Sequence, residues 1–143
     1  MLAVLYDIHG NLVALEEVLG DAEAAGADAY LLGGDFASWS PWPHETIERL
    51  RGLPNTTWVR GNGERWLRER PLDRPEVMEA LSERDSGLGT DEGWLYSLQS
   101  RFEEDGVLYV HGCPRQDDDS FASDHYDDLL TPEFRAAVAR KEA

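Results

Sequence analysis

The segment "LYDIHGNL", residues 5–12, ends an apolar run on an aspartate and a histidine. Two short unbroken apolar runs, "LAVLY" at 2–6 and "AYLL" at 29–32, are typical of strands covered on both faces in a parallel sheet. Between them, apolar residues recur at helical spacing with acidic residues opposite, which predicts an amphipathic helix ending near Gly26. Strand, helix and strand within about thirty residues form a βαβ unit. The sequence therefore predicts an α/β fold.

The same alternation continues along the chain. "HETIERLRGL", residues 44–53, predicts a second helix, and "TTWV", residues 56–59, predicts a third strand. Further helices are expected at "ERWLRER", "PEVMEALSER", "DEGWLYSLQ" and, at 131–143, "TPEFRAAVARKEA".

A hairpin is predicted in "SRFEEDGVLYVHG", residues 100–112. Its two β-rich segments flank Asp105 and Gly106, a pair that favours a tight turn between antiparallel strands. We expect residues 1–143 to form a single domain, because this length suits one hydrophobic core.

The charge balance restricts the partners of the chain. There are 29 Asp and Glu residues against 13 Lys and Arg, a formal net charge of −16, and no local basic patch stands out. Such a field repels nucleic-acid backbones and anionic membranes, so neither is an expected partner. No apolar run of about eighteen residues and no signal peptide are readable, which favours the cytoplasm. The single cysteine, Cys113, agrees with a reducing compartment and is interpreted as a packed core residue.

Polar side chains follow each predicted strand. Because the carboxyl ends of strands meet at one edge of an open α/β sheet, these side chains should converge there. Carboxylate, amide and imidazole groups together suit manganese, iron or zinc better than calcium. The candidate metal ligands are Asp7, His9, Asp35, Asn62 and His111.

Each candidate also has a structural interpretation. Asp35 and Asn62 follow or lie between glycines and suit turns, and His111 suits a buried position with its hydrogen bonds satisfied. Four strands that all end on ligand-type residues nevertheless favour a shared metal site.

Four motifs occur in the order found in a known family. "DIHGN" (7–11), "GGDFASWSPWPHE" (33–45), "RGNGE" (60–64) and "VHGCP" (110–114) resemble those of the calcineurin-like metallophosphoesterases, specifically the small bacterial and archaeal phosphoesterases. The resemblance extends from residue 2 to about residue 140. It implies an α/β sandwich, in which β-sheets are flanked by helices.

The resemblance also implies a mechanism. Asp7 and His9 would bind one metal ion, Asp35 would bridge two, and Asn62 and His111 would bind the other. The cofactors would be two divalent ions, Mn, Fe, Zn or Ni, with Mn favoured, that activate a shared water for attack on phosphorus. The expected reaction is hydrolysis of a small phosphomonoester or phosphodiester.

The sequence departs from the family pattern in two places. Gly63 stands where many relatives have a histidine that assists the leaving group, although Glu64 keeps the acidic character of the next position. No G-H-x-H motif follows "VARKEA", so we expect a C-terminally incomplete domain with one protein ligand fewer at each metal. His125 is a weak candidate replacement, and His44 is expected near the rim of the site.

The absent segment has a packing consequence. Relatives complete the second sheet with it, so the hairpin at 100–112 should have an exposed edge and apolar face. We therefore expect a homodimer that covers this surface, or a fragment of a longer protein.

Two other functions stay open. Besides an active phosphoesterase, the chain could be a degenerate, non-catalytic relative that binds metal or a partner through the same edge. A nucleotide-binding α/β module is the third interpretation, and it is the weakest because no G-x-G-x-x-G follows the first strand.

Overall fold

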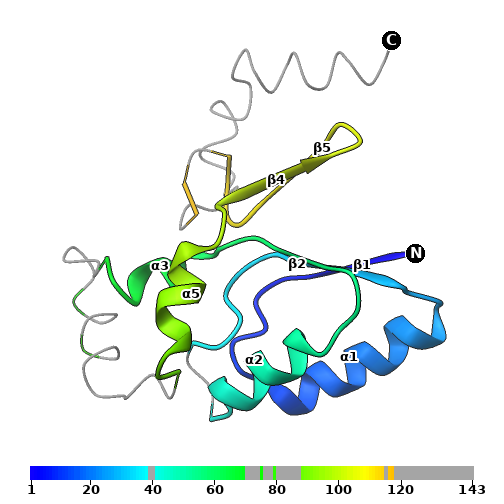
Figure 1. Cartoon of the computed structure of the whole chain (residues 1–143), viewed down its shortest axis with the longest axis horizontal. Helices are drawn as coiled ribbons and strands as arrows, with labels where there is room; N and C mark the ends of the chain where they lie inside the picture. The colour runs from blue at the N-terminus through cyan, green and yellow to red at the C-terminus, as the bar shows by residue number, and fades with distance from the viewer. Residues whose placement is uncertain (39–40, 70–74, 76–78, 80–87, 115, 118–143) are drawn as a thin grey trace.

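The computed structural model describes residues 1–38, 41–69, 75, 79, 88–114 and 116–117 (Figure 1). The helix expected at 131–143 and most of the one in "PEVMEALSER" lie outside these residues. The elements in chain order are β1 (Leu2–Leu5), α1 (Leu12–Ala24), β2 (Ala29–Leu32), α2 (Pro43–Arg51), β3 (Thr56–Trp58), α3 (Asn62–Trp66), α5 (Asp91–Ser97), β4 (Arg101–Glu104) and β5 (Val107–Val110).

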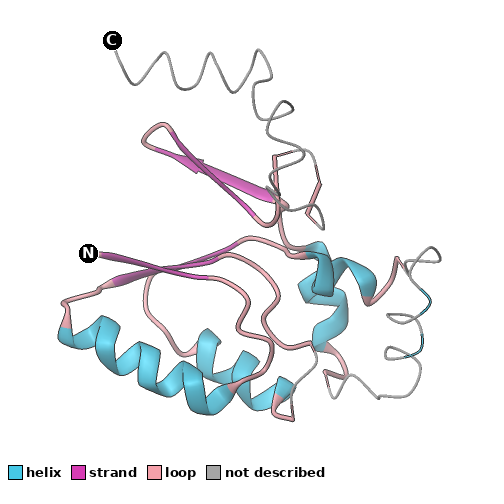
Figure 2. Ribbon diagram, turned by 180° about the vertical axis from the view of Figure 1, so that it is seen from behind, coloured by secondary structure: helices cyan, strands magenta, loops and turns pink. Residues whose placement is uncertain are grey.

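A parallel sheet organises the first half of the chain. Within the described residues its strands lie in the order β1-β2-β3, with Leu5 opposite Leu32 and Leu32 opposite Trp58. Helix α1 connects β1 to β2, and α2 connects β2 to β3, so the predicted βα alternation is confirmed. Figure 2 shows α1 and α2 together on one side of this sheet and the β4-β5 hairpin on the other.

Helix α1 packs on the sheet through a narrow apolar face. Its N-cap is Asn11, whose side chain accepts a hydrogen bond from the amide of Ala14. Leu15 and Leu19 are buried in the core, and each such side chain stabilises the fold by about 1.5–3 kcal/mol. Val18, another apolar residue at helical spacing, is 44% exposed because the stripe that contacts the core is narrow.

The prediction that the strands are covered on both faces holds for β2 and is wrong for β1. Tyr30, Leu31 and Leu32 of β2 are all buried. In β1, Leu2 is 39% and Val4 is 45% exposed. The physical reason is position, since β1 is an edge strand of the described sheet and the α1 and α2 helices cover only one side.

The predicted hairpin is confirmed. β4 and β5 pair antiparallel, and the turn residues Asp105 and Gly106 have φ values of 51° and 75°, as a tight turn between strands requires. Val107 and Leu108 are 37% and 43% exposed, in agreement with the expected apolar surface. After β5 the chain returns to the parallel sheet, where the ring of His111 stacks on Tyr6.

None of the helices in the described part of the chain is long and apolar enough to cross a membrane. The mixed α/β arrangement agrees with the fold class expected from the sequence.

Candidate metal centre

The loops that follow β1 and β2 run side by side at the carboxyl end of the sheet. The amide of Asp7 donates to the carbonyl of Gly34 at 3.2 Å, and the amide of His9 donates to that of Asp35 at 2.8 Å. Parallel pairing thus continues beyond the strands and carries the polar side chains of both loops to one place.

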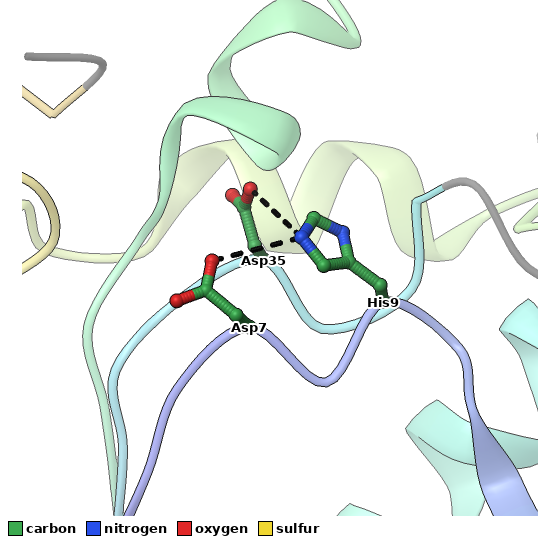
Figure 3. A group of neighbouring side chains, drawn as sticks. All are labelled: Asp7, His9 and Asp35. Carbon is green, nitrogen blue, oxygen red and sulfur yellow. Dashed lines mark ion pairs between the residues drawn. The ribbon is translucent and has the colours of Figure 1, made fainter.

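Three of the predicted ligands lie close together. One ligand atom from each of Asp7, His9 and Asp35 lies within 4.8 Å of the others, and Figure 3 shows the three side chains directed at one another. Nε2 of His9 is 3.6 Å from Oδ1 of Asp7 and 3.8 Å from Oδ2 of Asp35. These separations are too long for direct hydrogen bonds and leave room for a cation between the groups.

His111 joins the same group from the end of β5. Its Nε2 atom is 3.6 Å from Oδ1 of Asp35 and 3.9 Å from Oδ1 of Asp7. The two oxygens of Asp35 therefore face different imidazoles, Oδ2 facing His9 and Oδ1 facing His111. This arrangement suits a carboxylate that bridges two cations.

Both histidines are oriented through their other ring nitrogen. Nδ1 of His9 lies 3.2 Å from the carbonyl of Ser38, and Nδ1 of His111 lies 2.9 Å from the carbonyl of Gly33. A carbonyl can only accept, so Nδ1 carries the proton in both hydrogen bonds. Nε2 then presents its lone pair toward the carboxylates, which is how metal-binding imidazoles are commonly held.

The electrostatics of the site favour a cation. Asp35 is 4% exposed, and burial raises the pKa of its carboxyl group, an effect that His111 opposes. Among the described residues, the only basic groups within ion-pair distance of Asp7 and Asp35 are the imidazoles of His9 and His111. A divalent cation would compensate these carboxylates. The side chain of Asp7 is 61% exposed, so the site opens to solvent.

The remaining predicted ligand, Asn62, begins helix α3 between two glycines. The amide of Gly63 donates to Oδ1 of Asp35 at 2.7 Å, so the backbone around Asn62 lies against the buried carboxylate. The side-chain amide of Asn62 as a metal ligand stays a prediction.

Glu64 is a functional candidate that the sequence reasoning described only as acidic. It is 1% exposed, and its carboxylate accepts hydrogen bonds of 2.9 Å from the amides of Asp35, Phe36 and Gly61. Burial raises the pKa of Glu64, as does the charge of Asp35, while the amide bonds oppose this. Glu64 thus ties the β2 loop to the β3 loop. Its place directly after the G-N-x motif was the available signal.

The backbone of the site is strained. Asp7, His9 and Asp35 have φ values of 53°, 50° and 56°, a left-handed conformation that is uncommon for residues other than glycine. Such strain is found mostly at functional sites, where the surroundings enforce it. No pattern of residue types in the sequence indicated these conformations beyond the tolerance that aspartate has for them.

Two glycines allow the loops to approach. A Cβ at Gly34, where φ is 107°, would lie 2.6 Å from the backbone of Gly61 and 2.8 Å from Nδ1 of His111. A Cβ at Gly61 would lie 2.2 Å from Oδ1 of Asp35. Any side chain at either position would separate the candidate metal ligands.

The other histidines do not join this group among the described residues. His44 lies on α2, where Nε2 is 3.4 Å from Glu48 and Nδ1 is 3.8 Å from Asp91, so its ion pairs are directed at α2 and α5. His125, considered as a replacement ligand, lies outside the described residues.

Comparisons with known proteins find related chains. The chain is similar to a metallophosphoesterase from Sphaerobacter thermophilus of known crystal structure, with a TM-score of 0.69 and 27% identity over 93% of this chain and 56% of that one. It is also 40% identical over 62 residues to an uncharacterised protein of Methanocaldococcus jannaschii, a match that covers 43% of this chain. The matched part spans only 25% of that curated relative.

A family model supplies the broadest match. The model of the calcineurin-like phosphoesterases matches residues 2–138, which include every candidate ligand described above. The chain therefore belongs to the calcineurin-like phosphoesterase family.

Proposed function

We propose that this chain is a metal-dependent phosphoesterase that hydrolyses phosphomonoesters or phosphodiesters. The cofactors are two divalent cations, of which manganese is favoured. The proposed ligands are Asp7, His9, Asp35, Asn62 and His111. The substrate is a small phosphoester, and the cytoplasm is the proposed location.

The observation that carries this proposal is the environment of Asp35. One carboxylate oxygen faces Nε2 of His9 at 3.8 Å and the other faces Nε2 of His111 at 3.6 Å. Because Oδ1 of Asp7 lies within 3.9 Å of both imidazoles, the donors are suited to two neighbouring cations. When bound, such cations lower the pKa of a water and neutralise charge on the phosphoryl oxygens.

The residues of the chain contribute position and access. The carbonyls of Ser38 and Gly33 fix the two imidazoles, and the amide of Gly63 fixes one oxygen of Asp35. The half-exposed His9 and the exposed Asp7 leave a path for the substrate. Gly63 offers no side chain to protonate a leaving group, and such assistance is worth about a hundred-fold or more. Esters with good leaving groups are therefore the better substrates.

The direct test is hydrolysis of bis-p-nitrophenyl phosphate and p-nitrophenyl phosphate by purified protein with added manganese. Wild type releases p-nitrophenol, whereas Asp35→Asn releases none above background. Asp21→Asn, a change at an exposed position of α1, is the matched control and keeps wild-type activity. Absence of turnover in wild type with every divalent metal tested would reject the proposal.

A second candidate function is a degenerate relative that binds metal without turnover. The observation that favours it is the lack of space for a side chain at Gly63. A Cβ there would lie 2.9 Å from both Oδ1 of Asp35 and Oγ of Ser38. The position as folded does not accommodate the histidine that many relatives have there. Tight manganese binding, measured by calorimetry, together with no hydrolysis of either ester would select this function.

A further inference from the structure

A pocket of about 320 Å³ lies beside the metal centre, between the β4-β5 hairpin and the segment that follows it. We call it the hairpin pocket, and its volume is at the lower end of the range of small-molecule sites, about 300–1,000 Å³. The residues that matter for its chemistry are Arg65, Arg101, Val110, His111, Cys113 and Asp117.

His111 connects the hairpin pocket to the metal centre. The side chain lines the pocket, and its Nε2 atom lies 3.6 Å from the buried carboxylate of Asp35. The pocket and the metal centre therefore share His111 as a common residue.

The two arginines of the pocket differ in their partners. Arg65 is neutralised by Asp117, with Nη2 2.8 Å from Oδ1 and Nε 3.0 Å from Oδ2. Arg101 makes no ion pair within the described part of the chain, although the chain carries a net charge of −16. Its guanidinium is thus available to a ligand.

The hairpin register fixes the direction of Arg101. It pairs with Val110 across the strands, so both side chains lie on the same face, and both line the pocket. A planar guanidinium forms paired, charge-assisted hydrogen bonds with a carboxylate or a phosphate, which an ammonium group does not match.

We propose that the hairpin pocket binds the organic group of a phosphoester that carries a second anionic group, a carboxylate or a phosphate, and that Arg101 is the residue that recognises this group. The inference rests on the proposed function, because it places the first phosphoryl group at the metal centre. It adds the class of substrate and a residue that determines specificity.

The test uses phosphonates, which the protein does not hydrolyse. Binding of phenylphosphonate, 4-carboxyphenylphosphonate and benzene-1,4-diphosphonate is measured by titration calorimetry with manganese present. Wild type binds the carboxylate or diphosphonate probe about threefold to fivefold tighter than phenylphosphonate, as expected for a pair formed by an exposed arginine. The doubly anionic probe with the larger gain in affinity shows whether the second anion is a carboxylate or a phosphate.

Three variants test whether Arg101 causes the preference for the doubly anionic probe. Arg101→Gln reduces the preference for the doubly anionic probe to less than about twofold, and Arg101→Lys retains part of it because the charge stays without the planar geometry. Arg68→Gln is the matched control, since Arg68 is exposed and lies over the ring of Tyr96 outside the pocket. It keeps the wild-type preference.

Three results would overturn the inference, and the first two are distinguishable from the third. Equal affinity of wild type for all probes, or an unchanged preference in Arg101→Gln, rejects the recognition of a second anion by Arg101. If the protein still hydrolyses p-nitrophenyl esters, the proposed function stands. If wild type neither binds phenylphosphonate nor hydrolyses any ester, the proposed function fails and the inference fails with it.

Discussion

Oε2 of Glu64 accepts a hydrogen bond of 2.9 Å from the amide of Asp35, so one buried carboxylate holds the backbone of another. The same oxygen accepts the amide of Gly61, and Oε1 accepts that of Phe36. The two loops that carry Asp35 and Asn62 are therefore joined through the side chain of Glu64. Glu64 is a positioning residue for the metal centre.

Removal of the Glu64 carboxylate should destabilise the fold. Glu64→Ala leaves three buried amides without acceptors, each costing about 1–3 kcal/mol, so the free energy of unfolding should fall by at least about 3 kcal/mol. Glu64→Gln should lose less stability, because an amide oxygen in the place of Oε2 keeps the two hydrogen bonds from Asp35 and Gly61. Urea denaturation measures both variants, with the exposed Glu17→Ala as control, expected within about 0.5 kcal/mol of wild type. A Glu64→Ala protein as stable as wild type would contradict this assignment.

The sequence predicted the fold and the convergence of the strand ends because periodicity and local turn residues determine both. The alternation of strands and helices and the hairpin turn at Asp105 and Gly106 follow from such local signals. The exposure of Val4 could not be predicted, since the number of layers on a strand depends on distant segments. The acceptor role of Glu64 also depends on packing between loops that are distant in sequence.

The stability of the metal-free protein should depend on pH through Asp35. Burial raises the pKa of this carboxyl group in the folded state, so its contribution is greatest below the unfolded value of about 3.9 and is lost as pH rises through the folded value. In chelator, the free energy of unfolding of wild type minus that of Asp35→Asn should therefore fall from about pH 4 to pH 7. Manganese should reverse the trend, because it binds the deprotonated ligand. A difference that does not vary with pH would contradict the prediction.

The imidazoles of the metal centre should share one tautomer before metal is added. Carbonyl acceptors at Nδ1 of His9 and His111 require the proton on that nitrogen. Long-range ¹H–¹⁵N spectra of the metal-free protein at neutral pH should show Nδ1–H for both residues, with Nε2 shifting on addition of zinc. His44, whose two ring nitrogens both lie near carboxylates, is the internal control and should not respond to zinc. A mobile mixture of tautomers at His111 would argue against a preorganised site.

Two copies of the chain should associate through exposed apolar strand residues. Val107 and Leu108 of β5 are 37% and 43% exposed, and β5 has an unpaired edge within the described residues. Sedimentation velocity of wild type should show a dimer whose fraction rises with concentration. Leu108→Lys should shift the population to monomer. Val13→Lys, which replaces an exposed apolar residue of α1 in the same way, should not. A wild-type protein that stays monomeric at all concentrations would reject the expected homodimer.

Close packing at Gly61 should make the metal centre intolerant of a single methyl group. A Cβ there would lie 2.2 Å from Oδ1 of Asp35 and 2.6 Å from its amide, so Gly61→Ala must displace this carboxylate. We expect manganese affinity to fall at least tenfold, about 1.4 kcal/mol, in calorimetric titrations. Gly20→Ala is the matched control, because no atom lies within 4 Å of its added Cβ and its helical backbone favours alanine. That variant should keep the wild-type affinity and gain about 0.5–1 kcal/mol of stability, whereas equal affinities in the two variants would show that Gly61 does not limit the approach of the loops.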